Sequence, residues 1–186
     1  MARSDTKALI LKAARKLLTR GGTQAITMRA IAAEVGISAA GLYRHYRSRA
    51  EILETLATAE FERLRRSLML PAKSKTWRRQ LEIAVERYLD HAVSGPEFFA
   101  VMLAMDHPST TRDDDWPASA ALLHERALEL LGDEIPRQQA RDAAYGIVAA
   151  THGVIMLTPA NHRKRAKLNR QKVAIRIVQA VAGSYH

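Results

Sequence analysis

The 186-residue sequence has no cysteine, and only 5% of its residues are aromatic. The lack of cysteine excludes a disulfide scaffold, a thiolate zinc site, an iron–sulfur cluster and a cysteine nucleophile. The sequence also lacks the GxGxxG, P-loop, HExxH and GxSxG patterns of common nucleotide-binding and hydrolytic enzymes. Hydrophobic residues make up 47% of the chain, which is enough to bury a core in one or two small domains.

Acidic residues are scarce in the first 50 positions. This segment has ten Lys and Arg residues but only two acidic residues, Asp5 and Glu34, so it holds +8 of the chain's net charge of +10. A basic first quarter on a nearly neutral remainder indicates a polyanionic partner, nucleic acid first and an anionic membrane second. Charge alone leaves a solvated basic face open as the alternative.

Uncharged runs long enough to span a membrane are nearly absent. Residues 143–161 have no Asp, Glu, Lys or Arg, but they include His152, Pro159 and two glycines, which suit a buried helix or a subunit interface better than lipid. The first residues have no apolar segment followed by a small-residue cleavage site, so no secretory signal is expected. We therefore expect a cytoplasmic protein, associated with the nucleoid when it is bound to DNA.

Alternating strand patterns are also missing, and hydrophobic residues repeat at helical spacing, which predicts an all-α fold. The first predicted helix ends at Gly21-Gly22. Further helices are predicted over 27–35, from 38, and over about 49–70, 76–94, 117–131, 136–158 and 170–183, and a short apolar run covers 98–105.

Three helix starts follow one another within 22 residues. Thr27 and Ser38 are suited to cap two short helices, and Gly36 between them supplies a left-handed turn residue. Ser48 with Glu51 three residues later forms a capping-box pattern at the start of a third helix. These spacings predict a compact helical cluster.

The first two of these helices have the outline of a helix-turn-helix. Arg29 and the helix start at Thr27 are expected to meet phosphate. The second helix begins with three small residues that allow close approach to base edges: Ala39, Ala40 and Gly41. Several donors follow, some for phosphate and one, Arg44, for a guanine edge.

The sequence of residues 27–53 resembles the signature of the TetR family of transcriptional repressors. The resemblance rests on the Gly-Ile-Ser turn, the Leu-Tyr-x-His-aromatic run and the basic-x-Glu-Ile-Leu start of the next helix, and it covers roughly residues 6–57. It implies an all-α homodimer with a three-helix DNA-binding domain at 1–50 and an effector-binding and dimerisation domain at 51–186. A linking helix, about 49–70, joins the two.

The same resemblance implies which residues contact DNA. Thr27 and Arg29 match contacts of the second helix, and the three small residues match the base-facing start of the recognition helix. Tyr43, His45 and Arg49 match positions that hold phosphate. The predicted DNA-binding set is Thr27, Arg29, Ser38, Ala39, Ala40, Gly41, Tyr43, Arg44, His45 and Arg49.

A second, weaker resemblance lies near the end of the chain. Tyr145 followed by His152-Gly153 is similar to a Trp-x-x-x-x-x-x-His-Gly pattern in the penultimate helix of one subgroup, with Tyr in place of Trp. It implies that helices 137–157 and 170–183 pair with their symmetry mates in a dimer. The predicted interface residues are Gly146, Ala149, Ala150, Gly153, Ile175 and Val178.

A pocket between the C-terminal helices is expected to bind the effector. Its predicted lining is Tyr88, His91, Phe99, Met102, Met105, Trp116, His124, Tyr145 and His152. Each of these residues has ordinary core packing as its alternative role. Because most polar groups in this set are His or Tyr, the set favours an apolar or aromatic effector.

Two other functions have partial signals in the sequence. Asp106 and His107 near residues 113–115 could form a metal or acid–base cluster, but no further ligand has a recognisable spacing. The basic stretch 161–172 could bind a membrane surface, but it has no bulky apolar face. The sequence therefore predicts a ligand-responsive repressor of a palindromic operator, not an enzyme, with no cofactor, no metal and no membrane partner.

Overall fold

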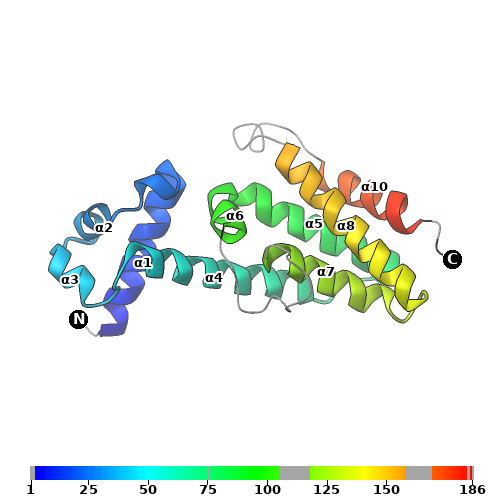
Figure 1. Ribbon diagram of the computed structural model, residues 1–186, viewed down its shortest axis with the longest axis horizontal. Coiled ribbons are helices and arrows are strands. Elements are labelled where there is room, and N and C mark those ends of the chain that lie inside the picture. Colours follow the sequence, from blue (N-terminus) through cyan, green and yellow to red (C-terminus); the bar gives the residue numbers. More distant parts are fainter. Residues whose placement is uncertain (1–2, 75, 105–117, 158–168, 184, 186) are drawn as a thin grey trace. The chain divides into compact units, whose positions relative to one another are not determined.

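The chain folds into helices throughout the part that the computed structural model describes, which is residues 3–74, 76–104, 118–157, 169–183 and 185 (Figure 1). The predicted all-α fold is confirmed. Two compact units are present: Met1–Phe61 with Glu97–Met105, and Glu62–Pro96 with Asp106–His186. Because α4 (Arg49–Met69) continues from the first unit into the second, the domain boundary at residue 50 stays a prediction.

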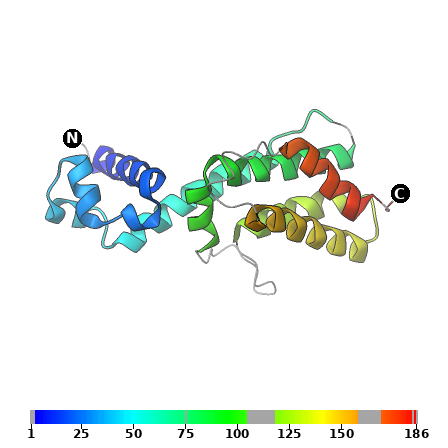
Figure 2. The same ribbon diagram turned by 90° about the horizontal axis from the view of Figure 1, so that it is seen from above.

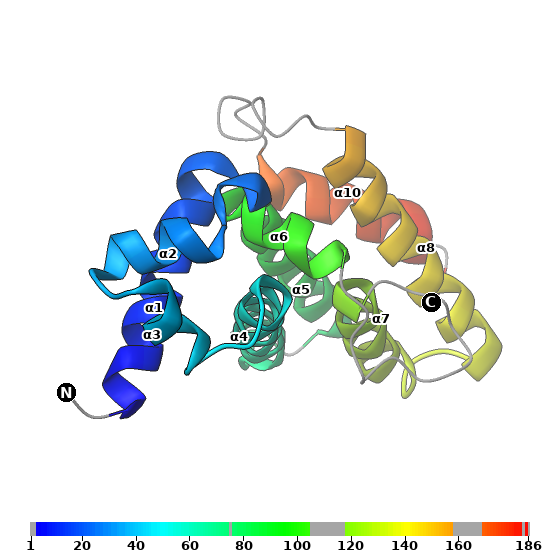
Figure 3. The same ribbon diagram turned by 60° about the vertical axis from the view of Figure 1, so that its left-hand side comes forward.

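The N-terminal unit is built around α1 (Arg3–Gly21), which packs against α2 (Met28–Val35), with α3 (Ala39–Tyr43) beside α2 (Figure 3). The short 3-10 helix η1 (Thr23–Ala25) connects α1 to α2. The unit also contains the first part of α4 and nearly all of α6 (Pro96–Leu103). Its fully buried apolar side chains include Ile10, Leu18, Ile26, Ile31, Leu42 and Ile52.

The helix starts predicted at Thr27 and Ser38 are confirmed. The Thr27 hydroxyl accepts the N–H of Ala30 at 3.1 Å, and the Ser38 hydroxyl accepts the N–H of Gly41 at 3.0 Å. Gly36 ends α2 with φ of 77°, the left-handed conformation that glycine adopts without a steric penalty. Two short helices are therefore fixed locally, each by its own cap.

The capping box at the start of α4 forms only in part. The Ser48 hydroxyl accepts the N–H of Glu51 at 3.1 Å, as predicted. The Glu51 carboxylate accepts the N–H of Arg47 at 2.6 Å, one residue before the position that a capping box uses. The carboxylate therefore orders the turn between α3 and α4 as well as the helix start.

The C-terminal unit is a helical bundle in which α5 (Trp77–Ser94) packs against its neighbours α7 (Ala118–Leu131), α8 (Arg137–Leu157) and α10 (Arg170–Ala182) (Figure 2). The second part of α4 also belongs to it. Helix α8 begins one residue after the predicted start, because Pro136 lies at the cap and its carbonyl accepts the N–H of Ala140. The apolar run that begins at Phe98 lies mostly in a helix, α6, which begins at Pro96, and Pro117 lies outside the described residues.

None of the described helices is both long enough and apolar enough to cross a membrane. Residues 143–157 of the uncharged run lie in α8, where seven side chains are buried within the helical unit: Ala140, Ala143, Ala144, Ile147, Val148, Thr151 and Ile155.

Candidate nucleic-acid interface

Helix α3 exposes one side and buries the other. Leu42 is fully buried, while Ala39, Ala40 and Arg44 are exposed and the Tyr43 side chain is 53% exposed. The buried side anchors α3 to the unit by hydrophobic packing. The exposed side is therefore available to meet a duplex.

Gly41 plays a different part from its two alanine neighbours. It is buried, and a methyl group there would lie 3.2 Å from Oγ of Ser38 and 3.8 Å from Nη2 of Arg44. The small residue thus makes room for side chains of its own chain. The prediction that all three small residues face the bases stays a prediction, and the exposed surface supports it only for Ala39 and Ala40.

Two acidic groups of the N-terminal unit, Glu34 and Glu60, pair with basic side chains of α1. Glu34 pairs with Lys16 and with Arg20, the latter at 3.7 Å, and the Lys16 ammonium lowers the pKa of the Glu34 carboxyl. Arg15 pairs with Glu60. These contacts neutralise charge on α1, away from α3 in the sequence.

Arg29 and Arg44 form no ion pair or hydrogen bond through their side chains within the described residues. Both side chains are exposed. The same holds for Arg47, in the turn between α3 and α4, which the sequence-based set omitted. Its place in the basic run from Arg44 to Arg49 was the signal that could have included it.

Arg49 is engaged by its own chain. Its Nε donates to the carbonyl of Ile26 at 2.7 Å, and its Nη2 donates to the carbonyl of Thr23 at 2.6 Å. The guanidinium thereby joins the first residue of α4 to η1 and to the start of α2. A phosphate contact by Arg49 stays a prediction, and this arrangement adds a structural role that the sequence did not indicate.

His45 and Tyr46 end the recognition segment. The Nδ1 atom of His45 is buried without a hydrogen-bond partner, and its backbone N–H donates to Leu42. Tyr46 is buried, burial raises the pKa of its phenol, and the Nζ of Lys7 lies 5.4 Å from its ring centroid. The buried aromatic ring therefore holds the end of α3 against α1.

Two of the residues predicted to bind an effector are in direct contact. Tyr88 and His152 meet inside the C-terminal unit, where the hydroxyl and Nε2 share a hydrogen bond of 2.6 Å. Burial raises the pKa of Tyr88 and lowers that of His152. This pair is a polar contact between α5 and α8.

The other predicted effector residues come from several helices. Phe99 and Met102 are buried in α6, which belongs to the N-terminal unit, and His124 is half-buried in α7. Met105 and Trp116 lie outside the described residues. His91 lines an open cavity of about 210 Å³ whose other lining residues are polar or charged: Arg63, Ser67, Arg87, Asp90 and Ser94.

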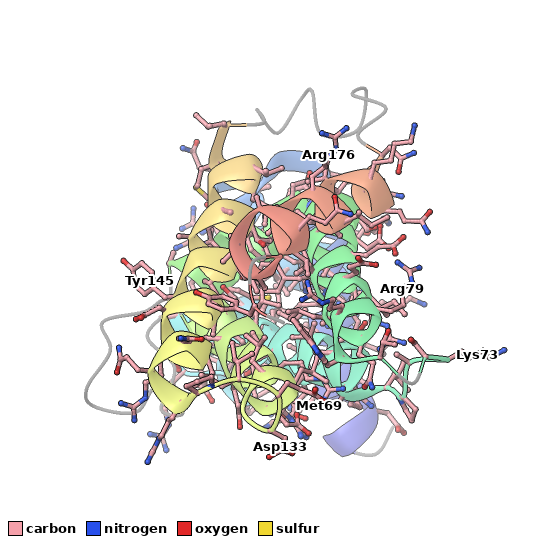
Figure 4. All side chains as sticks on the ribbon, turned by 90° about the vertical axis from the view of Figure 1, so that its right-hand side faces the viewer. Met69, Lys73, Arg79, Asp133, Tyr145 and Arg176 are labelled. Atoms are coloured by element: carbon pink, nitrogen blue, oxygen red, sulfur yellow. The ribbon has the colours of Figure 1, made fainter. Side chains whose placement is uncertain are left out.

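The outer side of α8 carries exposed hydrophobic side chains. Tyr145 is 59% exposed and projects away from the bundle (Figure 4), and Met156 and Leu157 are 53% and 86% exposed. Ala149 is exposed on the same helix, and a methyl group at Gly153 would meet nothing within 4 Å. This side of α8 is open.

Two residues predicted for the dimer interface have close neighbours in their own chain, and their place in an interface stays a prediction. A methyl group at Gly146 would lie 2.9 Å from Cγ1 of Val181, so Gly146 makes room for α10 of the same protomer. Val178 is buried within the bundle. Ile175 and Ala150 are half-buried.

No group of three or more His, Cys, Asp or Glu side chains among the described residues could hold a metal ion. Asp106, His107 and residues 113–115, weighed above as a metal or acid–base cluster, lie outside these residues. In the basic stretch, 161–168 also lie outside them, and Arg170 pairs with Asp90.

Comparison with known proteins gives a sequence match and a set of similar folds. Residues 10–56 match the family of bacterial regulatory proteins of the tetR family. No curated protein sequence matches the chain.

Solved structures resemble nearly the whole chain. A protein of unknown function from Rhodococcus sp. RHA1 has a TM-score of 0.75 at 22% identity over 97% of this chain and 95% of its own. A TetR-family transcriptional regulator from Streptomyces coelicolor has a TM-score of 0.69 at 20% identity over 98% of each chain. A TetR from Acinetobacter baumannii AYE, in complex with minocycline, has a TM-score of 0.60 at 18% identity. The match covers 94% of this chain and 93% of its own.

The helix-turn-helix geometry, the matched residues and the fold agree with one another. At these identities the solved structures show the fold, and the matched segment contains the exposed α3 and both helix caps. The family consists of non-enzymatic DNA-binding regulators. Residues 10–56 match the tetR family of bacterial regulatory proteins, and the chain as a whole has the fold of solved TetR-family transcriptional regulators.

Proposed function

We propose that the protein is a homodimeric repressor that binds a palindromic operator and is released from it by a small-molecule effector. The observation that carries this proposal is the exposed side of α3. Helices α2 and α3 each have a side-chain cap, and Arg29 and Arg44 flank the exposed side without acidic partners. An uncompensated basic surface beside a helix-turn-helix is suited to the phosphates of a duplex.

Each part of this surface has a distinct task in the proposed complex. Helix α3 enters the major groove, where the methyl groups of Ala39 and Ala40 can contact thymine methyls and Arg44 can donate two hydrogen bonds to a guanine. Arg29 and the free N–H groups at the start of α2 hold phosphate. Phosphate contacts position the helix, and the base contacts provide the preference for a sequence.

The exposed side of α8 supports a dimer of this chain. Tyr145 and Met156 are eleven residues apart, about three helical turns, and therefore lie on one side of α8 with Ala149 and Gly153 between them. Large exposed side chains beside small ones form a surface on which an identical helix can pack across a two-fold axis. In such a dimer two α3 helices can reach successive major grooves, ~34–36 Å apart.

Release by an effector requires that the ligand bind more tightly to a dimer whose two α3 helices no longer match successive major grooves. Weakening of the operator complex 100-fold corresponds to roughly 2.7 kcal/mol of coupling. In the N-terminal unit, Arg15 of α1 pairs with Glu60 of α4, and its guanidinium lies 5.2 Å from the ring centroid of Phe98 in α6. A shift of α4 or α6 would act on α1 through this side chain.

The test is selection from random duplexes by the purified full chain, followed by sequencing. We expect enrichment of a palindrome whose half-sites are about one helical turn apart or slightly more. Enrichment of a single half-site without symmetry would contradict the dimer, and no enrichment at low ionic strength would contradict the DNA-binding surface itself.

A further inference from the structure

Arg47 lies in the turn that joins α3 to α4, and the backbone of this turn is fixed on both sides of it (Figure 3). The backbone N–H of Arg47 donates to Oε2 of Glu51 at 2.6 Å. The preceding residue, Tyr46, is buried, and its N–H donates to the carbonyl of Leu42 at 3.1 Å. The hydroxyl of the following residue, Ser48, accepts the N–H of Glu51. The point from which the Arg47 side chain extends is therefore held in place.

The guanidinium of Arg47 is not engaged by the protein in the way that its backbone is. Arg47 is exposed, and its side chain makes no ion pair or hydrogen bond in the part of the chain that the structure describes. The nearest acidic residue in the sequence, Glu51, accepts the backbone N–H of the turn instead. A planar fork of donors on a fixed backbone is suited to an anion outside the chain.

Arg49, two residues further along, has a different environment. Its Nε and Nη2 donate to the carbonyls of Ile26 and Thr23, at 2.7 and 2.6 Å. These two bonds connect the first residue of α4 to the segment that precedes α2. Arg49 therefore positions the start of α4, and with it the turn that holds Arg47.

A carboxylate lies at the start of α4, where the helix itself would otherwise attract an anion. The first N–H groups of a helix carry partial positive charge. In α4 the Ser48 hydroxyl and the half-buried Glu51 carboxylate lie at this end. Because the charge of Glu51 offsets that of the helix start, a phosphate near this turn requires a cationic side chain.

We propose that Arg47 holds a phosphate of the operator beyond the end of the recognition helix, and that Arg49 is a positioning residue for this contact. The start of a recognition helix meets the bases, whereas the segment beyond its other end lies toward the sugar–phosphate backbone. The inference rests on the proposed function of an operator-binding repressor. It reverses the assignment that the family resemblance implied, in which Arg49 holds phosphate and Arg47 has no part.

The test is the salt dependence of binding between the full chain and its selected duplex, compared for Arg47→Gln and Arg49→Gln. Each lost phosphate contact lowers the slope of log K against log salt concentration by about 0.9, and one contact from each protomer gives about 1.8. We expect this decrease for Arg47→Gln. The ratio of wild-type to variant affinity should accordingly fall about 12-fold between 50 and 200 mM salt.

Urea unfolding of the same variants separates a DNA contact from a positioning role. Arg47→Gln removes no hydrogen bond from the described part of the folded chain, so its urea midpoint should equal that of the wild type. Arg49→Gln removes the guanidinium that donates to Ile26 and Thr23, so its midpoint should fall.

Lysine substitutions give a second comparison at constant charge. Arg47→Lys keeps a cation for phosphate and should retain most of the wild-type affinity and slope. Arg49→Lys keeps the charge but loses the planar fork that joins two carbonyls, so its urea midpoint should still fall. A wild-type midpoint for Arg49→Lys would contradict the positioning role of Arg49.

Arg65→Gln is the control for the loss of one positive charge, because Arg65 lies in α4 and pairs with Glu62 at 2.9 Å. Its slope should equal that of the wild type. A decrease for Arg47→Gln that exceeds those of Arg65→Gln and Arg49→Gln supports the proposal, and a decrease no larger than either overturns it. Wild-type protein that does not bind the duplex at low salt contradicts the proposed function and, with it, this contact.

Discussion

At the scale of single residues, the DNA-facing surface depends on which basic side chains are free of the protein's own carbonyl and carboxylate groups. Arg49 donates twice to its own backbone, whereas Arg44 makes no such contact. Tyr43 is exposed beside it. Side chains of similar charge in one short run therefore have different roles.

Substitution of Arg44 should change sequence preference more than overall affinity. Arg44→Ala removes a donor pair for a guanine edge, worth about 1–3 kcal/mol of discrimination. Tyr43→Ala should weaken binding to all duplexes alike, because it removes a phosphate contact. Competition between the selected operator and random DNA measures both effects. Equal losses on the two DNAs for Arg44→Ala would refute its role in base recognition.

The cap at Thr27 offers a test of local stability. Thr27→Ala leaves the N–H of Ala30 without its acceptor, so we expect a loss of about 1 kcal/mol in the free energy of unfolding. Thr27→Ser keeps the hydroxyl and should restore most of it. Urea titration followed by circular dichroism measures the difference, and equal stability of the Ala and Ser variants would contradict the cap.

Local interactions were predictable from the sequence, and distant ones were not. The caps of Thr27 and Ser38 and the turn at Gly36 depend on residues within four positions, which the sequence displays directly. The contacts of Arg49 with Thr23 and of Gly146 with Val181 join residues 26 and 35 positions apart. Such contacts depend on how helices pack, which hydrophobic periodicity does not specify.

At the scale of helices, polar pairs join elements that are far apart in the sequence. In the N-terminal unit, the Glu60 side chain of α4 is 1% exposed and pairs with Arg15 of α1, which is 40% exposed. In the C-terminal unit, Tyr88 of α5 meets His152 of α8. Each pair fixes the register of two helices. Helix existence was predictable, but which unit α6 joins was not, since that depends on packing.

Removal of the two partners of the α1–α4 ion pair should have unequal effects. Arg15→Leu removes a cation that pairs with the buried Glu60 carboxylate, which should cost about 2 kcal/mol after allowance for the solvent exposure of Arg15. Glu60→Gln leaves an arginine that can turn to water and should cost less. Urea unfolding of both variants gives the order, and a larger loss for Glu60→Gln would contradict this account.

The Tyr88–His152 pair predicts how stability changes with pH. Burial lowers the pKa of His152 in the folded protein below its ordinary value of 6.5, which applies to the unfolded chain. At pH values between the folded and the unfolded pKa, the unfolded chain therefore binds more protons than the folded one. This contribution to stability is complete above about pH 6.5 and is lost as the pH falls below it. Urea midpoints at pH 7.5 and pH 5.5 should therefore differ more for wild-type protein than for His152→Gln. An equal difference would show that the imidazole is not held neutral.

At the scale of the whole molecule, the proposed function depends on two exposed surfaces: the basic surface around α3 and the apolar side of α8. Family resemblance indicated both from the sequence, although the structure assigns Gly146 and Val178 to contacts within one protomer. The cavity between α4 and α5 had no sequence signal, because its lining residues come from two helices.

The dimer can be tested by a charge placed on the apolar side of α8. Tyr145→Arg and Met156→Arg alter exposed side chains, so the fold should persist while the two-fold packing is lost. Sedimentation equilibrium should show dimers for wild-type protein and monomers for the variants. Arg137→Glu, at the first residue of α8 and exposed, is the control and should stay dimeric. Variants that sediment like the wild type would place the interface elsewhere.

The most direct test of the central claim is the salt dependence of binding between the full chain and its selected duplex, measured by fluorescence anisotropy. Each phosphate contact contributes about 0.9 to the slope of log K against log salt concentration. We predict a steep slope for wild-type protein and a decrease of about 1.8 for Arg29→Ala, one contact from each protomer. Arg20→Ala, whose guanidinium pairs with Glu34, should leave the slope nearly unchanged. No binding at low salt, or an equal decrease for both variants, would contradict the assignment of this surface to DNA.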